Sequence, residues 1–139
     1  MIKDTVEKLI NKYKTNSPFI LAHKLKVNII YENLGETMGY FTNDYRIKFI
    51  HINNTLSEDE CRFTCAHELG HAILHPNVNT PFLKRYTLYS IDRIERQANA
   101  FAVELLMPDK LLHEHPECSF YDIAGRVGIP PKLVVLKKQ

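Results

Sequence analysis

The stretch "CRFTCAHELGHAILHP", residues 61–76, contains two histidines four residues apart, with a glutamate directly after the first. On an α-helix, residues four apart emerge only about 40° from each other around the axis, so His67 and His71 point toward the same place. Two imidazoles arranged in this way can bind one metal ion. Glu68 projects beside that place, where its carboxylate can reach a water molecule next to the metal and act as a general base.

The residues on either side of this stretch predict a helix with defined ends. Ser57 and Glu60 have the spacing of a capping box at its start, and Pro76 stops it. An ordinary amphipathic helix whose histidines have no special role is the alternative interpretation. In a chain of this composition, with 7 histidines, the HExxH pattern is expected by chance only about 0.02 times. The motif therefore favours a metal site.

A third ligand is expected on a separate element, because a catalytic zinc usually takes three protein ligands and leaves one position for water. The segment "IERQANAFAVELLMP", residues 94–108, has the periodicity of a core helix that ends at Pro108. Glu95 and Asn99 are four residues apart beside its buried face, so Glu95 can bind the metal while Asn99 steadies a histidine. The alternative for Glu95 is an ordinary solvated charge, since a lone glutamate on a helix normally faces water.

His75 is a rival for the third ligand, since it lies one helical turn beyond His71. A continuous helix places His67, His71 and His75 in a row about 12 Å long, and one metal cannot easily reach both ends of it. The three-histidine metzincin motif also has a different spacing. We expect His75 to interact instead with the helix dipole or with the last carbonyls of the helix.

The rest of the chain predicts an α+β fold in one domain, residues 1–139. Asp4 with Glu7, and Ser17 before Pro18, are start signals for two N-terminal helices. Runs of β-branched and aromatic residues predict three strands, at 27–32, 38–42 and 46–53. With turn residues at 43 and 44, these runs predict a small antiparallel three-stranded sheet packed on the HExxH helix and further helices.

Composition narrows the class of protein. Hydrophobic residues make up 45% of the chain and charged residues 24%, which is typical of a globular protein and excludes disorder and fibres. No apolar run approaches the roughly 20 residues of a membrane span, and the N-terminus has no signal-peptide core, so we expect a cytoplasmic protein. Three cysteines are an odd number, which argues against a disulfide framework. Cys61 and Cys65 should be thiols that face the core.

The net charge and the C-terminal segment both argue against direct binding of nucleic acid. The net charge is only +2, and the basic residues are interspersed with acidic ones. The segment "SFYDIAGRVGIPPKLVVLKKQ", residues 119–139, superficially resembles a helix-turn-helix motif, but its last helix is very short and its lysines are few. We therefore expect no direct contact with nucleic acid and interpret the segment as a lid or docking surface.

The two motifs "FTCAHELGHAILH" and "ERQANAFAVELLMP" resemble, in this order, those of the ImmA/IrrE family. This is a family of small bacterial and phage-borne metallopeptidases related to the gluzincins. The resemblance covers nearly the whole chain, including the "IHIN" strand before the HExxH helix. It implies a gluzincin-like fold and a zinc-dependent endopeptidase that binds one Zn²⁺ per chain through His67, His71 and Glu95. It also implies that Glu68 is the catalytic base and that Asn99, where the wider gluzincin pattern has an acid, supports a ligand.

The resemblance also implies a substrate class. Members of the family cleave helix-turn-helix repressors, so a repressor is the expected protein substrate and an anti-repressor role in a mobile element is the expected function. Some members add a C-terminal sensor domain, and this chain resembles the minimal form. Two alternatives stay open: a noncatalytic zinc-containing module that holds a transcription factor, against which the intact Glu68 argues, and a general zinc peptidase that acts on short peptides.

Two details of the mechanism are left open by the sequence. The developing oxyanion needs a donor besides the metal, and four side chains are available for this role: Tyr86, Tyr89, His113 and His115. The strand at 46–53 fits an edge strand that pairs with an extended substrate, although it can equally be paired on both sides within the sheet.

Overall fold

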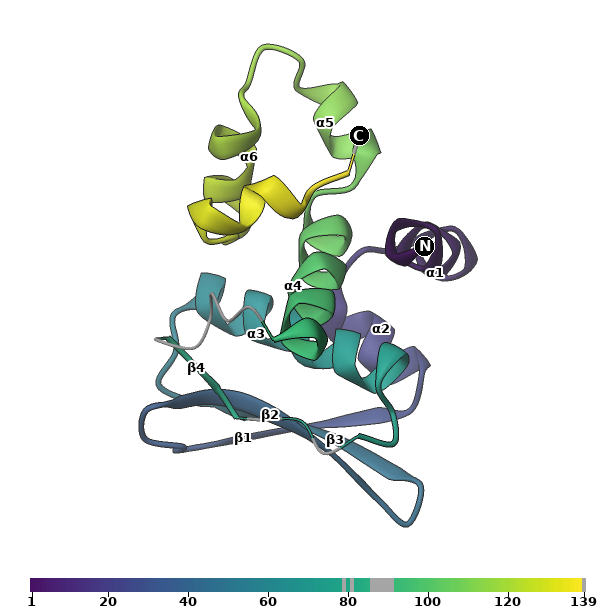
Figure 1. The fold of residues 1–139 in the computed structure, drawn as a ribbon, viewed down its shortest axis with the longest axis vertical. Helices are drawn as coiled ribbons and strands as arrows, with labels where there is room; N and C mark the ends of the chain where they lie inside the picture. Colours follow the sequence, from purple (N-terminus) through teal and green to yellow (C-terminus); the bar gives the residue numbers. More distant parts are fainter. Residues whose placement is uncertain (79, 81, 86–91, 139) are drawn as a thin grey trace.

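A mixed sheet lies beneath stacked helices in the computed structural model, which describes residues 1–78, 80, 82–85 and 92–138 (Figure 1). The elements follow one another as α1 (Ile2–Tyr13), α2 (Pro18–Lys24), β1 (Val27–Glu32), β2 (Thr37–Asp44), β3 (Ile47–Asn53), α3 (Glu58–Leu74), β4 (Leu83–Lys84), α4 (Arg93–Leu106), α5 (Asp109–Glu114), α6 (Phe120–Val127) and the 3₁₀ helix η2 (Pro131–Leu136). The α+β class expected from the sequence is therefore confirmed.

The sheet differs from the three-stranded antiparallel sheet that the sequence predicts. Its strand order is β1-β3-β2-β4, with β1 parallel to β3 and with β2 antiparallel to both β3 and β4. β3 lies between β1 and β2, so two strands that are neighbours in the sequence are not neighbours in the sheet. The fourth strand, β4, is only two residues long, which is too short to produce a recognisable alternation of apolar and polar residues.

The hairpin between β2 and β3 turns two residues later than predicted. Asn43 and Asp44, expected in the turn, still belong to β2, and Asp44 pairs with Ile47. The turn residues are Tyr45 and Arg46, with φ of 51° and 68°. Positive φ at both central residues gives the turn the twist that two-residue hairpins favour, so strand pairing outweighs the turn preference of Asn43 and Asp44.

The start of α3 is confirmed by its hydrogen bonds. The Glu60 backbone N–H donates to Ser57 Oγ at 3.2 Å, and the Ser57 N–H donates to Glu60 Oε1 at 3.1 Å, which completes the capping box. Ser17 likewise caps α2, as predicted. The capping box predicted at Asp4 is wrong, because α1 already begins at Ile2 and has no side-chain cap.

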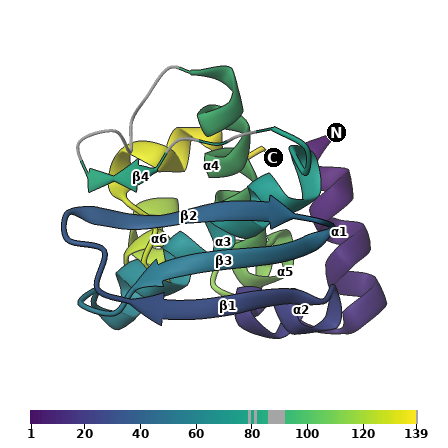
Figure 2. The ribbon, with the colours of Figure 1, turned by 90° about the horizontal axis from the view of Figure 1, so that it is seen from below.

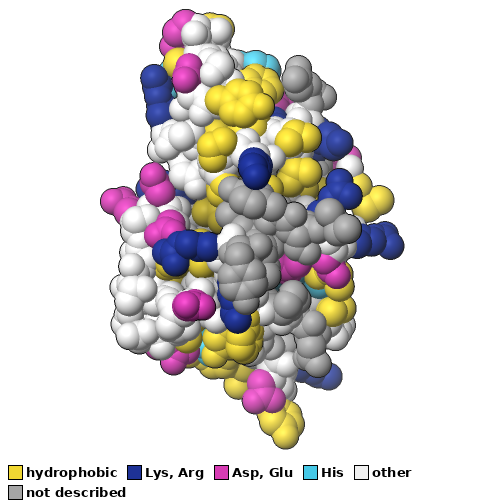
Figure 3. All heavy atoms as spheres, turned by 60° about the vertical axis from the view of Figure 1, so that its left-hand side comes forward, with side chains coloured by type: hydrophobic (Ala, Val, Ile, Leu, Met, Phe, Trp, Pro, Cys, Tyr) yellow, Lys and Arg dark blue, Asp and Glu magenta, His cyan; other side chains and the backbone are white. Residues whose placement is uncertain are grey.

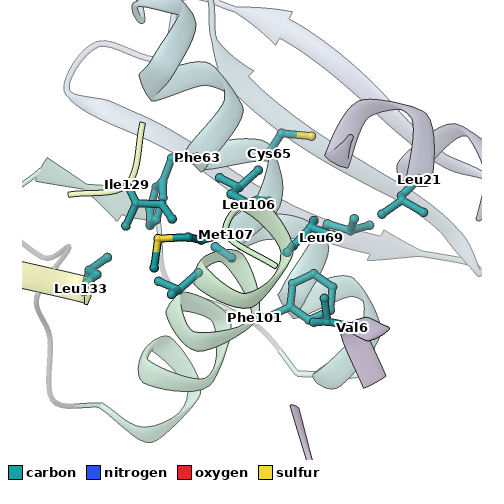
Figure 4. Packing of buried hydrophobic residues seen from close by; sticks show 14 of the residues in the cluster. Val6, Leu21, Phe63, Cys65, Leu69, Phe101, Leu106, Met107, Ile129 and Leu133 are labelled. Carbon is teal, nitrogen blue, oxygen red and sulfur yellow. The ribbon is translucent and has the colours of Figure 1, made fainter. Parts of the chain in front are cut away.

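α3 is the central element of the fold. The sheet lies on one side of it and α4 on the other (Figure 1), and the core around both helices includes Phe63, Leu69, Phe101 and Leu106 (Figure 4). Because α3 is covered on both sides, its polar residues are buried together with its apolar ones. Functional side chains of α3 are therefore enclosed between the sheet and α4.

Two glycines allow the close packing around α3. A Cβ atom at Gly39 of β2 would lie 2.6 Å from both the backbone oxygen of His51 and Cγ2 of Thr64, distances that no real side chain tolerates. A Cβ atom at Gly70 of α3 would lie 3.1 Å from Cβ of Phe101 on α4. The absence of a side chain at these positions therefore brings β2 and α4 close to α3.

The opposite face of the sheet is not covered by any helix in the described part of the chain (Figure 2). His51 lies on this face, stacks on Tyr40 with ring centroids 4.1 Å apart, and contacts Glu32 and Thr42 through its two ring nitrogens at 3.0 and 3.1 Å. Tyr40, Thr42 and His51 border a cleft of about 920 Å³. The cleft lies on the far side of the sheet from α3 and α4.

The C-terminal segment packs onto α4 and is held there by an ion cluster. Ile129 and Leu133 are buried in the core, and η2 is a 3₁₀ helix of 6 residues. Nζ of Lys137 lies 2.6 Å from Glu104 Oε1 on α4 and 2.9 Å from Asp109 Oδ1. The segment therefore lacks the long second helix of a helix-turn-helix motif and completes the core instead.

The distribution of surface charge and the free thiols of the cysteines agree with what the composition predicts. On the face shown in Figure 3, Lys and Arg side chains are mixed with Asp and Glu side chains. None of the described helices is long and apolar enough to cross a membrane. Cys61, Cys65 and Cys118 are free thiols. Cys65 is completely buried and Cys61 is half-buried against the core, so both face the core as predicted.

Candidate metal centre

Two helices bring together the three side chains that the sequence singles out as metal ligands. His67 and His71 come from α3, and Glu95 comes from the first turn of α4. Nε2 of His67 is 3.2 Å from Glu95 Oε2, and Nε2 of His71 is 2.7 Å from Glu95 Oε1. One ligand atom from each of the three residues lies within 4.8 Å of the others, a spacing that could hold a metal ion.

Each histidine of this set is also held through its other ring nitrogen. Nδ1 of His67 is 2.8 Å from Oδ1 of Asn99, the contact expected from the four-residue spacing of Glu95 and Asn99. Nδ1 of His71 is 3.0 Å from Nδ1 of His75. Metal-binding histidines in proteins typically have such partners, which fix the orientation and the tautomer of the ring.

The contacts of His75 differ from those expected from the sequence. Its ring hydrogen-bonds to the side chains of His71 and Gln97 rather than to helix carbonyls, and it is outside the group of possible ligands. The HExxHxxxH spacing placed His75 beside His71. The contact with Gln97 had no local signal, because it depends on how the end of α3 packs against α4.

Burial and mutual attraction shift the pKa values of this group strongly. Burial alone raises the pKa of Glu95, but its contacts with His67 and His71 outweigh burial and lower it to about 2. Burial alone lowers the pKa of His67, but the carboxylates of Glu95 and Glu68 raise it overall. At His71 burial dominates, and the pKa is lowered. Glu95 is therefore an anionic ligand group between two imidazoles.

Glu68 is completely buried, and neither of its carboxylate oxygens has a hydrogen-bond partner among the described residues. Burial raises its pKa to about 8, against the attraction of His67, whose Nε2 lies 4.0 Å from Glu68 Oε2. In the described part of the chain, Nε2 of His67 is also without a hydrogen-bond partner, although Glu95 Oε2 lies 3.2 Å away. Buried polar atoms normally have partners, so this group fits a site that receives a cation and a water molecule.

Two of the other side chains considered from the sequence, His113 and His115, are not brought to this site. His113 and His115 belong to the end of α5, which begins beyond the end of α4 opposite to Glu95 (Figure 1). Tyr86 and Tyr89 lie outside the described residues.

Of the two alternatives left open for the strand at 46–53, the structure has the strand that is paired on both sides and not the edge strand. The corresponding strand, β3, pairs with β1 on one side and with β2 on the other. Its backbone therefore cannot pair with an extended substrate.

An HExxH helix combined with a glutamate from a following helix is the His₂Glu arrangement of zinc metallopeptidases. Comparison with known proteins agrees with this class. The family model of the M78 peptidases, described as the IrrE N-terminal-like domain, matches residues 22–137. The chain belongs to this family, as the resemblance of its motifs indicated.

Two relatives are similar over most of the chain. Uncharacterized immunity region protein 2 of Bacillus phage phi105 is 48% identical over 140 residues, which cover 99% of this chain and 89% of that protein. Metallopeptidase ImmA of Bacillus subtilis (strain 168) is 35% identical over 115 residues, which cover 81% of this chain and 67% of that protein.

Proposed function

We propose that this chain is a zinc-dependent endopeptidase, with His67, His71 and Glu95 as zinc ligands and Glu68 as general base. The observation that carries the proposal is the position of Glu68: it is fully buried, has no hydrogen-bond partner within the described ranges and lies beside three convergent ligand groups. Burying a carboxyl group without a hydrogen bond is costly for stability, and a catalytic role gives a reason for that cost. Two histidines and one carboxylate, with a position left for water, are a ligand set of catalytic zinc.

The roles of the residues follow from their contacts. Zinc, when bound, polarises the scissile carbonyl and lowers the pKa of water toward about 7. Glu68 accepts the proton of the attacking water and delivers it to the leaving amine. Asn99 holds the ring of His67 through Nδ1 at 2.8 Å, so that Nε2 faces the site. Glu95 supplies the negative charge that favours cation binding.

The substrate that we propose is a helix-turn-helix repressor, cleaved in the cytoplasm. This part of the proposal is supported by the family resemblance of the two motifs and by the relative whose name describes a phage immunity region protein. A noncatalytic module that only holds a transcription factor would not need Glu68. A peptidase for short peptides would share the site but would not prefer a folded repressor.

The proposal is tested by cleavage of a candidate repressor, followed by gel electrophoresis and mass spectrometry. Glu68→Gln should keep zinc and the fold but lose activity by about 10²- to 10⁴-fold, because the amide cannot carry the proton. Glu58→Gln, an exposed change on the same helix, is the matched control and should cleave like the wild type. A chelator should abolish cleavage by the wild type.

Each alternative has its own outcome. Equal cleavage by wild type and Glu68→Gln would show that Glu68 is not the base. Binding of the repressor by both proteins without cleavage by either would favour the binding module. Faster cleavage of unstructured peptides than of the repressor would favour the general peptidase.

A further inference from the structure

The ring of His71 contacts a second buried histidine on the side away from Glu95. The Nδ1 atoms of His71 and His75 are 3.0 Å apart, and Nε2 of His75 is 2.7 Å from Oε1 of Gln97 on α4. His71 is completely buried and His75 is only 9% exposed. These contacts form a chain of hydrogen bonds that begins at a candidate ligand and ends at an amide oxygen.

With Oε1 of Gln97 facing His75 and with both rings neutral, one order of protons satisfies the contacts from His71 to Gln97. Oε1 of Gln97 can only accept, so Nε2 of a neutral His75 must carry the proton and donate it. Nδ1 of His75 is then an acceptor, and Nδ1 of His71 must donate to it. A lone pair is left on Nε2 of His71, the atom that lies 2.7 Å from Glu95 Oε1. Two acceptors face each other there, a conflict that a cation bound by both atoms removes.

We propose that His75 is a positioning residue that, together with Gln97, holds His71 in the tautomer whose Nε2 can bind the metal. The inference rests on the function proposed above, because it assigns His75 a purpose only if His71 is a ligand. His67 is served in the same way by a single partner, Asn99. His71 is held by two residues in series, His75 and then Gln97. Gln97 anchors this series of hydrogen bonds on α4.

A purely structural role does not explain the ring of His75. The end of α3 is completed by backbone, since the His75 N–H donates to the carbonyl of His71 at 2.8 Å, and Pro76 follows. Neither feature needs an imidazole. The ring is the part of His75 that contacts His71 and Gln97. Removing the ring should therefore lower the affinity for the metal.

The order of protons can be read directly. Long-range ¹⁵N–¹H NMR spectra of histidine-labelled protein report which nitrogen of each ring carries the proton, and the His75→Gln spectrum assigns the signals of His75. We expect His75 to be protonated on Nε2 in both the metal-free and the zinc-loaded wild type. A proton on Nδ1 of His75 would reverse the chain and overturn the inference.

Zinc affinity provides the second readout, measured by competition with a chromogenic chelator, with the fold checked by circular dichroism. His75→Leu removes the acceptor and should weaken zinc binding about 10- to 100-fold, the usual effect of losing such a partner. His75→Gln retains an acceptor oxygen and should recover most of this loss. Gln97→Met keeps the length of the side chain but removes the anchor, so it should weaken binding in the same direction by less. The exposed His113→Leu is the control and should bind zinc like the wild type.

The outcomes separate this inference from the proposed function. Equal zinc affinity in wild type and His75→Leu, or equal loss in His75→Leu and His75→Gln, would refute the positioning role and leave the zinc site intact. If His75→Leu does not fold, unchanged affinity in Gln97→Met would refute it. A wild-type protein that binds no zinc would refute the proposed function itself.

Discussion

Replacing the buried Lys137 by methionine should strongly destabilise the protein. Nζ of Lys137 lies 2.6 Å from Glu104 Oε1, and the side chains of both residues are at most 3% exposed. Methionine fills similar space but leaves the carboxylate of Glu104 with one remaining donor from the described residues, the backbone N–H of Lys138 at 2.9 Å. Breaking a buried ion pair by removing one partner typically costs about 3–5 kcal/mol.

A loss of this size is large compared with the stability of a typical domain, about 5–15 kcal/mol. For a chain of this length it corresponds to a fall in Tm of about 10–20 °C. Urea unfolding and thermal unfolding followed by circular dichroism measure both quantities. Lys138→Met, an exposed neighbour, is the control and should change the unfolding free energy by less than about 0.5 kcal/mol.

A double variant shows whether the buried charge is the cause. Adding Glu104→Gln to Lys137→Met removes the uncompensated charge and should restore part of the lost stability. A loss below about 1 kcal/mol for Lys137→Met would refute the reasoning, since the value is that of an exposed pair. So would a double variant that is less stable than Lys137→Met alone.

Acidification should act on the same cluster through Asp109. Hydrogen bonds from Lys137 and Lys3 lower the pKa of Asp109. Because this pKa is lower in the folded than in the unfolded protein, the stabilisation is present above the unfolded value and is lost as the pH falls through the folded one. In Lys137→Met, the decrease in stability below about pH 4 should therefore be shallower than in the wild type.

Two further predictions concern the metal site and its surroundings. Glu95→Ala should lower zinc affinity by more than the 10- to 100-fold typical of outer partners, because it removes a ligand, and unchanged affinity in a chelator competition would exclude Glu95 as a ligand. Gly39→Ala should cost about 1–3 kcal/mol in urea unfolding because its Cβ would meet backbone at 2.6 Å, whereas Gly125→Ala, with nothing within 4 Å, should not destabilise. Equal stability of the two glycine variants would contradict the close approach of β2 to α3.

Local signals were sufficient for much of the helical structure. The capping box at Ser57 and the cap at Ser17 act within one turn, so the sequence alone located the starts of α3 and α2. The positions of His67 and His71 on one side of α3, and of Glu95 beside Asn99 on α4, follow from the helical repeat. Their approach to within hydrogen-bonding distance depends on how α3 and α4 pack, which the repeat does not specify.

The sheet and the outer contacts of the site could not be predicted because they are not local. Each strand was recognisable from its residues, but the insertion of β3 between β1 and β2 depends on long-range pairing. The turn moved from Asn43 and Asp44 to the next two residues because pairing with β3 extends β2. The contact of His75 with Gln97 likewise joins two helices, so the sequence pattern of neither helix predicts it.

The close approach of Gly70 to Phe101 limits how far apart the two helices of the candidate metal site lie. Gly70 precedes His71 on α3, while Phe101 and Glu95 share α4. An added methyl group at Gly70 would meet Phe101 at 3.1 to 3.2 Å and would force the neighbouring atoms apart by a few tenths of an ångström. Metal–ligand distances define a site to within about 0.2 Å. A hydrocarbon contact that never touches the ion can therefore influence which ion, by size, the two helices accept.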